Sequence, residues 1–254
     1  MTQVRFFKDL PTLSKLGTTN SLLATENATG KNYRMSAADL KSELGSISID
    51  DVMDNVFIMC HRSSDSFPVC YRPSEWAAQE AAGNVATGVL LIDGGRKLVI
   101  APHEKTSTWS TCQVLCGTAS SDRLAAQELY NGKENCAKIL TNTTLAAEGD
   151  ASAVGWCNAY ERINAGGKGL KAGAWWLPSL GELYLMFANY TKINYALSKI
   201  SGATLLSKIA YWSCTETSAT NVWRLNFNYG YQYNGGKTTY QYGVRPVSAF
   251  AMAT

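Results

Sequence analysis

The chain has 254 residues, of which 46% are hydrophobic, and a formal net charge of +3. This length and apolar content allow one large domain, or one domain with an appendage. The Lys and Arg residues are dispersed, which argues against a nucleic-acid partner. No apolar run approaches the ~20 residues of a membrane helix, and the first residues lack a secretory signal, so we expect neither membrane insertion nor export by that route.

Residues 1–54 are predicted to form a small β/α segment ahead of the main domain. The segment contains spaced leucines but is too short for a core of its own. Ser36 to Asp39 has the S-x-x-D form of a helix start, which predicts a short helix at 37–44 that ends at Gly45. Two interpretations remain: an oligomerisation or attachment segment like the short repeats of phage tail fibres, or a decoration packed on its own domain.

No pattern in the chain favours a metal site. The acidic stretch 47–54 lacks the D-x-D-x-D-G spacing of a calcium loop and is interpreted as a connector. The seven cysteines are odd in number, lack metal-finger spacing and accompany only two histidines, so we expect free thiols in a reducing environment. They are Cys60, Cys70, Cys112, Cys116, Cys136, Cys157 and Cys214.

Periodicity and capping signals predict the elements between residues 55 and 190. They are a strand at 56–59, a helix at 74–82 beginning at Ser74, a hairpin at 88–101 turning at 93–95, and helices at 122–130, 151–164 and 179–189. In the 151–164 helix, Val154, Cys157, Tyr160 and Ile163 form one stripe, which predicts a core-packing face. Ser179 and Glu182 form a capping box, so Glu182 is interpreted as a capping residue and not a catalytic acid.

Residues 211–243 have the composition of a binding surface. They contain six Tyr and four Asn but only three charged residues, Glu216, Arg224 and Lys237. Tyr supplies large, stiff contact area, while Asn, Ser and Thr supply adaptable hydrogen bonds, which is why binding loops use these residues. The alternative is an ordinary sheet with one wet face.

Alternation from Trp223 predicts a strand and a hairpin in this stretch. Trp223, Leu225 and Phe227 have one parity, and Arg224, Asn226, Asn228, Gln232 and Asn234 have the other. Residues 234–237 are predicted to form the reversal, with 238–244 returning antiparallel. Tyr229, Tyr231 and Tyr233 stay ambiguous, because they share parity with Phe227 but Gly230 permits a turn that resets the faces.

Five separated motifs carry a family resemblance over residues 84–254. They are WWLPSLGEL at 175–183, YWSCTE at 211–216, W-x-L-N-F-x-x-G at 223–230, Lys237, and VRPVSAF at 244–250. The chain resembles bacterial and phage C-type-lectin-fold domains related to the formylglycine-generating-enzyme family. Its Tyr- and Asn-rich end is similar to the variable proteins of diversity-generating retroelements, in which adenine mutagenesis diversifies Asn codons.

The resemblance implies an α+β C-type lectin fold over residues 55–254, with a variable region at about 211–250. It implies that the 88–101 hairpin lies beside the last strands. The alternation over 223–233 predicts that Leu225 and Phe227 are buried, along with Trp212, Val244 and Val247, and Trp175 and Trp176 are expected to fill the core between helix and sheet. The residues expected to contact ligand are Ser218, Thr220, Asn221, Arg224, Asn226, Asn228, Tyr229, Tyr231, Tyr233, Asn234, Tyr240 and Tyr242.

The function expected from these features is receptor binding at a phage tail tip, for attachment to a host cell-surface protein or glycan. We expect a homotrimer docked on a phage tail structural protein, assembled in the bacterial cytoplasm and carried in the virion. The alternative is a bacterial surface or fimbrial lectin-like adhesin. Absence of a signal sequence favours the phage interpretation.

A third hypothesis is an oxidase of the formylglycine-generating type, which works through paired cysteines and copper. The C-terminal motif region carries only Cys214, and the sequence indicates no second cysteine close to it. It indicates no Ser/His/Asp or Cys/His arrangement, and it lacks the calcium-dependent sugar-binding motifs of animal lectins. We therefore expect no catalytic residues, no metal and no cofactor.

Overall fold

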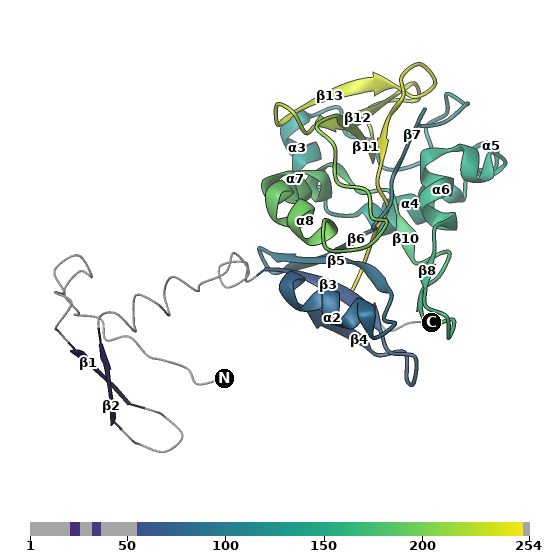
Figure 1. Cartoon of the computed structure of the whole chain (residues 1–254). Coiled ribbons are helices and arrows are strands. Elements are labelled where there is room, and N and C mark those ends of the chain that lie inside the picture. Colours follow the sequence, from purple (N-terminus) through teal and green to yellow (C-terminus); the bar gives the residue numbers. More distant parts are fainter. Residues whose placement is uncertain (1–20, 26–31, 37–54, 251–254) are drawn as a thin grey trace. The chain divides into compact units, whose positions relative to one another are not determined.

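The structure, a computed structural model, describes residues 21–25, 32–36 and 55–250 (Figure 1). The chain divides into two units, Met1–Asp54 and Asn55–Thr254. In the first unit, β1 (Ser21–Thr25) and β2 (Asn32–Ser36) pair antiparallel, with Ser21 opposite Ser36. The predicted helix at 37–44 and the acidic connector at 47–54 lie outside the described residues.

The second unit is α+β and contains a six-stranded antiparallel sheet in the order β10-β15-β6-β5-β3-β4. Its strands are β3 (Val56–His61), β4 (Pro68–Tyr71), β5 (Ala86–Asp93), β6 (Arg96–Ile100), β10 (Trp175–Trp176) and β15 (Val247–Ser248). The predicted β5–β6 hairpin is confirmed: Gly94 and Gly95 both have positive φ, as a two-residue hairpin turn requires. The last strand pairs with β6, so the hairpin does lie beside the end of the domain.

A five-stranded sheet in the order β13-β12-β11-β14-β7 carries the motifs at 211–216 and 223–230, and its strands other than β7 are drawn in yellow-green to yellow in Figure 1. Its strands are β7 (Lys105–Ser107), β11 (Ala210–Glu216), β12 (Asn221–Asn226), β13 (Tyr231–Gly236) and β14 (Tyr242–Val244). All neighbours are antiparallel except β11 and β14, which are parallel. The strands β8 (Arg162–Ile163) and β9 (Gly169–Leu170) form a separate two-stranded antiparallel sheet.

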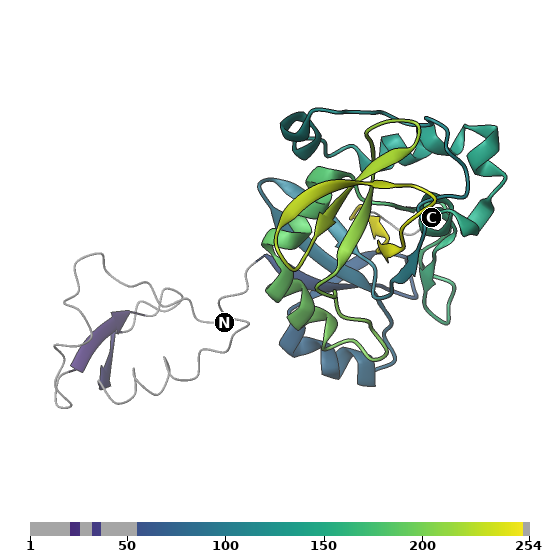
Figure 2. The same ribbon diagram turned by 90° about the horizontal axis from the view of Figure 1, so that it is seen from above.

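Helices lie beside both sheets. The turned view in Figure 2 shows the strands of the five-stranded sheet crossing in front of the helices. The helices are η3 (Pro73–Glu75), α2 (Trp76–Ala81), α3 (Arg123–Gln127), α4 (Gly132–Leu140), α5 (Thr143–Ala146), η4 (Gly149–Ala151), α6 (Ala153–Ala159), α7 (Leu180–Ala188) and α8 (Tyr190–Leu197). The predicted capping box of α7 is confirmed, because the Ser179 amide donates to Glu182 Oε2 at 2.8 Å and the Glu182 amide to Ser179 Oγ at 3.5 Å.

The predicted 151–164 helix is too long. It ends at Ala159 because Tyr160 is extended, with its ring 5.0 Å from that of Trp175 and its hydroxyl bonded to His103. Val154 and Cys157 are buried as expected, but Ile163 lies in β8 and is exposed. The helix predicted at 74–82 begins instead with a 3-10 turn at Pro73.

The helices α4, α5 and α8 were not predicted from the sequence. The notable residue is Gly132, which follows the helix predicted at 122–130 and begins α4; a Cβ there would lie 2.2 Å from Glu182 Oε2 and 2.7 Å from the Trp176 ring. The glycine therefore permits close packing against the start of α7, and does not form a C-cap.

The core contains the residues that the motifs predicted. Trp175, Trp176, Trp212, Leu225, Phe227, Val244 and Val247 are all buried. Phe227 packs among three rings on the helix side of the five-stranded sheet, from Phe187 of α7, Tyr190 of α8 and Tyr211 of β11. The sheet thus has one side fixed against α7 and α8, which leaves its other side for presentation.

Candidate ligand-binding surface

A four-residue turn at Phe227–Gly230 decides which tyrosines point outward. The reversal predicted at 234–237 is wrong, since Gly235 and Gly236 lie inside β13, opposite Val222 and Asn221. The chain turns instead at Gly230, whose φ is 75° and whose amide donates to the Asn226 carbonyl at 2.8 Å. Tyr231 then lies opposite Asn226, so the parity of the strand is reset.

This reset places Gln232 on the inner side, against the prediction from alternation. Gln232 lies opposite Leu225 and is only 3% exposed. Its side chain bonds to that of Gln127 at 2.6 Å, to the Tyr184 hydroxyl, and to the Arg123 carbonyl at 2.8 Å. The amide therefore joins β13 to α3 and α7, and its buried polar atoms are satisfied.

None of the twelve expected contact residues is buried. Thr220, Asn228, Tyr229, Tyr231, Tyr233, Asn234 and Tyr240 are exposed, and Ser218, Asn221, Arg224, Asn226 and Tyr242 are half-buried. Tyr229 is 65% exposed, Tyr233 52% and Tyr240 50%, which is unusual for large aromatic rings. Isolated apolar side chains on a surface need no explanation, but adjoining ones mark a contact site.

Strand pairing aligns five side chains in one row on the outer face of the five-stranded sheet. Tyr233 lies opposite Arg224, Arg224 opposite Trp212, and Tyr242 opposite Ser107. The Trp212 and Tyr242 rings meet at 4.6 Å and connect the two halves of the row. Within this row Trp212 is fully buried, and its Nε1 donates to the Ser107 carbonyl at 2.9 Å, so it is a rigid support for its neighbours.

Aromatic contacts extend this row into what we name the tyrosine surface, formed by Arg224, Tyr229, Tyr231, Tyr233, Tyr240 and Tyr242. Tyr229 stacks on Tyr231 at 5.5 Å, Tyr231 meets Tyr233 edge-on at 5.0 Å, and Tyr240 stacks on Tyr242 at 5.8 Å. The Arg224 guanidinium lies 5.5 Å from the Tyr233 ring and 4.5 Å from the Tyr242 ring, and so bridges the two tyrosine groups. Such contacts keep the rings ordered before any ligand arrives.

Five of the six remaining expected residues hold the loops at the edges of the surface: Ser218, Thr220, Asn221, Asn226 and Asn228. Ser218 Oγ accepts from the amides of Thr220 and Asn221, at 3.3 and 3.2 Å. Asn226 Oδ1 accepts from the Asn228 amide at 2.8 Å, inside the turn. These polar atoms therefore fix loop geometry, and the large contact area comes from the tyrosines.

A buried ion pair, whose role was not predicted from the sequence, joins the ends of β11 and β13 to residues 114–117. Lys237 Nζ pairs with Glu216 Oε1, and both side chains are fully buried. Glu216 also accepts from the Cys116 and Gly117 amides, while Lys237 donates to the Val114 carbonyl at 2.6 Å. The only available signal was that two opposite charges occur in an otherwise almost uncharged stretch.

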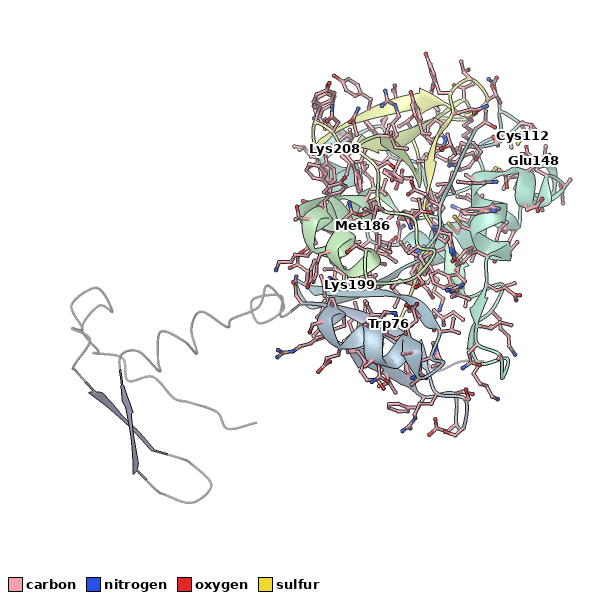
Figure 3. All side chains as sticks on the ribbon, viewed as in Figure 1. Trp76, Cys112, Glu148, Met186, Lys199 and Lys208 are labelled. Carbon is pink, nitrogen blue, oxygen red and sulfur yellow. The ribbon has the colours of Figure 1, made fainter. Side chains whose placement is uncertain are left out.

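Two further carboxylates hold the neighbouring segments. Glu148 accepts from the Thr111 and Cys112 amides at 2.9 and 3.0 Å, and Figure 3 places Glu148 beside Cys112. Glu104 accepts from Arg245 at 2.8 Å and from the Tyr211 hydroxyl at 2.8 Å, and burial raises the pKa of Tyr211. Both are structural pairings, with the acidic groups used as hydrogen-bond acceptors.

The structure corrects the expectation that Cys214 has no close second cysteine. Burial raises the pKa of the Cys136 thiol well above its ordinary value, and a side-chain hydrogen bond with Cys214 adds to this shift. Cys136 Sγ also donates to the Leu177 carbonyl at 3.3 Å, and all seven cysteines are free thiols. Within the described residues, no group of three or more His, Cys, Asp or Glu side chains is arranged to hold a metal ion.

Comparison with known proteins adds little to this geometry. No protein-family model matches the chain, and no curated protein matches it. A solved structure of a fimbrial protein from Bacteroides ovatus ATCC 8483 is similar at 14% identity and a TM-score of 0.43, over 93% of this chain and 58% of the other. At this TM-score the likeness carries no argument about fold or function. Among the described helices, none is long and apolar enough to cross a membrane.

Proposed function

We propose that this protein is a ligand-binding protein whose tyrosine surface attaches to a receptor on a bacterial host cell. The observation that carries the proposal is the continuous array of exposed tyrosines around Arg224, preordered on a sheet whose other face is buried. Tyr and Arg dominate the energetics of known binding interfaces, and preordering lowers the entropy lost on binding.

The scaffold in this proposal is a C-type lectin fold, and the surface is diversified by a retroelement. Support comes from the order of the five motifs, from the pairing of the last strand with β6, and from the position of the Asn and Tyr residues in loops and on an outward face. Such positions tolerate substitution because their side chains fill no core. A near-identical DNA repeat that differs from the 211–250 coding region at adenines would test this part of the proposal.

In this proposal residues 1–54 attach the protein to a phage tail structural protein and assemble it into a trimer. Their spaced leucines, in a segment too short to bury them alone, support an intermolecular contact. Several copies of one surface side by side convert weak single-site binding into avidity. The protein would then act at the tip of a virion.

Binding to intact cells tests the proposed function. The fluorescently labelled full chain is applied to a panel of bacterial strains, and bound fluorescence is compared with that of Tyr231→Ala, Tyr233→Ala and the double variant. The matched control is Phe67→Ala, since Phe67 is 48% exposed and also contacts an arginine, Arg62, but belongs to the connection between β3 and β4.

We expect strain-specific binding that falls about tenfold or more in the double variant and is unchanged in the control. Equal binding by the double variant and the native chain, on every strain that binds, would refute the proposed function.

A further inference from the structure

Arg224 is the one charged residue of the tyrosine surface, and the described part of the protein does not neutralise it. The other two charges of residues 211–243, Glu216 and Lys237, pair with each other in the interior. Arg62 and Arg245, in contrast, each pair with a carboxylate. The surface therefore presents a single uncompensated positive charge at its centre.

The guanidinium is oriented by aromatic rings and not by acceptors. It lies over Tyr242 and Tyr233, and its Nε–H is buried without a hydrogen-bond acceptor among the described residues. A buried donor without an acceptor is destabilising, and native proteins retain few of them. The guanidinium is planar, and its paired terminal N–H groups match the two-oxygen geometry of a carboxylate.

We infer that the tyrosine surface recognises a protein ligand in which one Asp or Glu carboxylate, surrounded by apolar side chains, binds Arg224. The inference rests on the proposed function and names the chemistry of its ligand. The carboxylate accepts hydrogen bonds from the terminal N–H groups of the guanidinium, and the tyrosine rings on both sides exclude water from the ion pair. An ion pair sheltered in this way is stronger than one on an open rim.

The charge count favours a protein over a polyanion. A phosphate group carries about −1.5 to −2 charges and would be only partly neutralised by one guanidinium. Nucleic acids and acidic polysaccharides repeat their charges, and their binding sites supply several cations along a groove. The remaining area of the tyrosine surface is uncharged and aromatic, which suits apolar protein side chains.

Titration of the isotope-labelled full chain tests the inference through the NMR signal of the Arg224 Nε–H group. The probes are the peptide acetyl-Leu-Asp-Leu-amide, its neutral counterpart acetyl-Leu-Asn-Leu-amide, glucuronate and inorganic phosphate. Arg96 is the matched internal control, because its guanidinium also lies over a tyrosine ring, that of Tyr130, at 3.5 Å, but on the β5–β6 hairpin.

We expect a saturable shift of the Arg224 signal with the Asp peptide, no shift with the Asn peptide, and no matching shift at Arg96. In Arg224→Lys, which keeps the charge but loses the planar fork, the Asp peptide should bind about tenfold more weakly, as read from the Tyr233 and Tyr242 amides. Equal shifts with both peptides, or equal shifts at Arg96, would overturn the inference. Tighter binding of glucuronate or phosphate than of the Asp peptide would overturn its assignment to a protein ligand.

The cell-binding assay separates this inference from the proposed function. If Arg224→Gln binds cells as the native chain does while the tyrosine double variant does not, the surface binds its receptor without the arginine, and the inference alone is wrong. If neither change affects binding, the proposed function is wrong as well.

Discussion

Charged side chains buried in the interior hold the five-stranded sheet in place, although none of them is part of the tyrosine surface. Glu216 and Lys237 are each fully buried, so each depends on the other for neutralisation. Glu182 is buried at the start of α7, where it accepts from the Ser179 amide and from Trp176 Nε1. Loss of one such partner leaves the other without compensation in a poorly solvated site.

The buried pair gives the first prediction. Lys237→Met should lower the free energy of unfolding by about 3–5 kcal/mol, because the Glu216 carboxylate stays buried without its cation. The double variant Glu216→Gln, Lys237→Met should recover part of this loss. Arg62→Ala, which breaks a pair whose side chains are about half exposed, is the control and should have a much smaller effect. Urea denaturation measures all four proteins; equal losses in the Lys237 and Arg62 variants would contradict the assigned role.

The second prediction concerns the pH dependence of stability. Burial raises the pKa of Glu182, while hydrogen bonds from Ser179 and Trp176 act in the opposite direction. The folded state therefore holds the Glu182 proton more tightly than the unfolded chain. This group stabilises the fold at low pH, and that contribution is lost as the pH rises from about 4.3 through the raised pKa.

Glu182→Gln keeps the capping box but removes the titration. The free energy of unfolding of the native protein minus that of the Gln variant should fall with rising pH, as measured by urea denaturation between about pH 4 and pH 8. A difference that is constant, or that increases with pH, would show that Glu182 is not the titrating group.

The decisive element is the β12–β13 hairpin, because its turn selects the residues that face outward. The sequence predicted the strands, the buried anchors Leu225 and Phe227, and the outward position of Arg224 and Asn226. It did not predict the place of the turn, since Asn234-Gly235-Gly236 has a stronger local turn signal than Phe227–Gly230. Packing of Phe227 against α7, α8 and Tyr211 outweighs that local preference.

Contacts between segments that are distant along the chain also could not be predicted from the sequence. Ser107 of β7 joins the outer row only through its pairing with Tyr242, and Cys136 meets Cys214 only when α4 packs on β11. Period and capping signals describe neighbours along the chain, whereas these contacts depend on strand order. The capping box of α7 and the β5–β6 hairpin, in contrast, depend on local residues and were predicted correctly.

The third prediction tests the turn. Gly230→Ala should destabilise the protein by about 2–3 kcal/mol, because the residue has positive φ and its Cβ would lie 2.7 Å from the Phe187 ring. Gly167→Ala has a similar φ but no atom within 4 Å of the added Cβ, so it should cost only about 1 kcal/mol. Thermal unfolding of both variants measures the difference; equal losses would remove the role of the Phe187 contact.

For the whole molecule, we expect an oligomer that depends on residues 1–54. Light scattering should give the mass of a trimer for the full chain and of a monomer for residues 55–254, which form a unit of their own. A full chain that is monomeric at micromolar concentration would rule out the oligomer. A trimer that persists after truncation would place the contact in residues 55–254.

Hydroxyl-radical footprinting on cells measures most directly which face of the protein makes contact. The full chain is oxidised free in solution and again while bound to a strain selected in the cell-binding assay, and the modified side chains are quantified by mass spectrometry. We expect binding to protect Tyr229, Tyr231, Tyr233 and Tyr240, whereas Phe67 and Leu124, which are also exposed, should stay fully reactive. Protection of Phe67 or Leu124 with unchanged oxidation of the four tyrosines would contradict the claim that the tyrosine surface is the binding face.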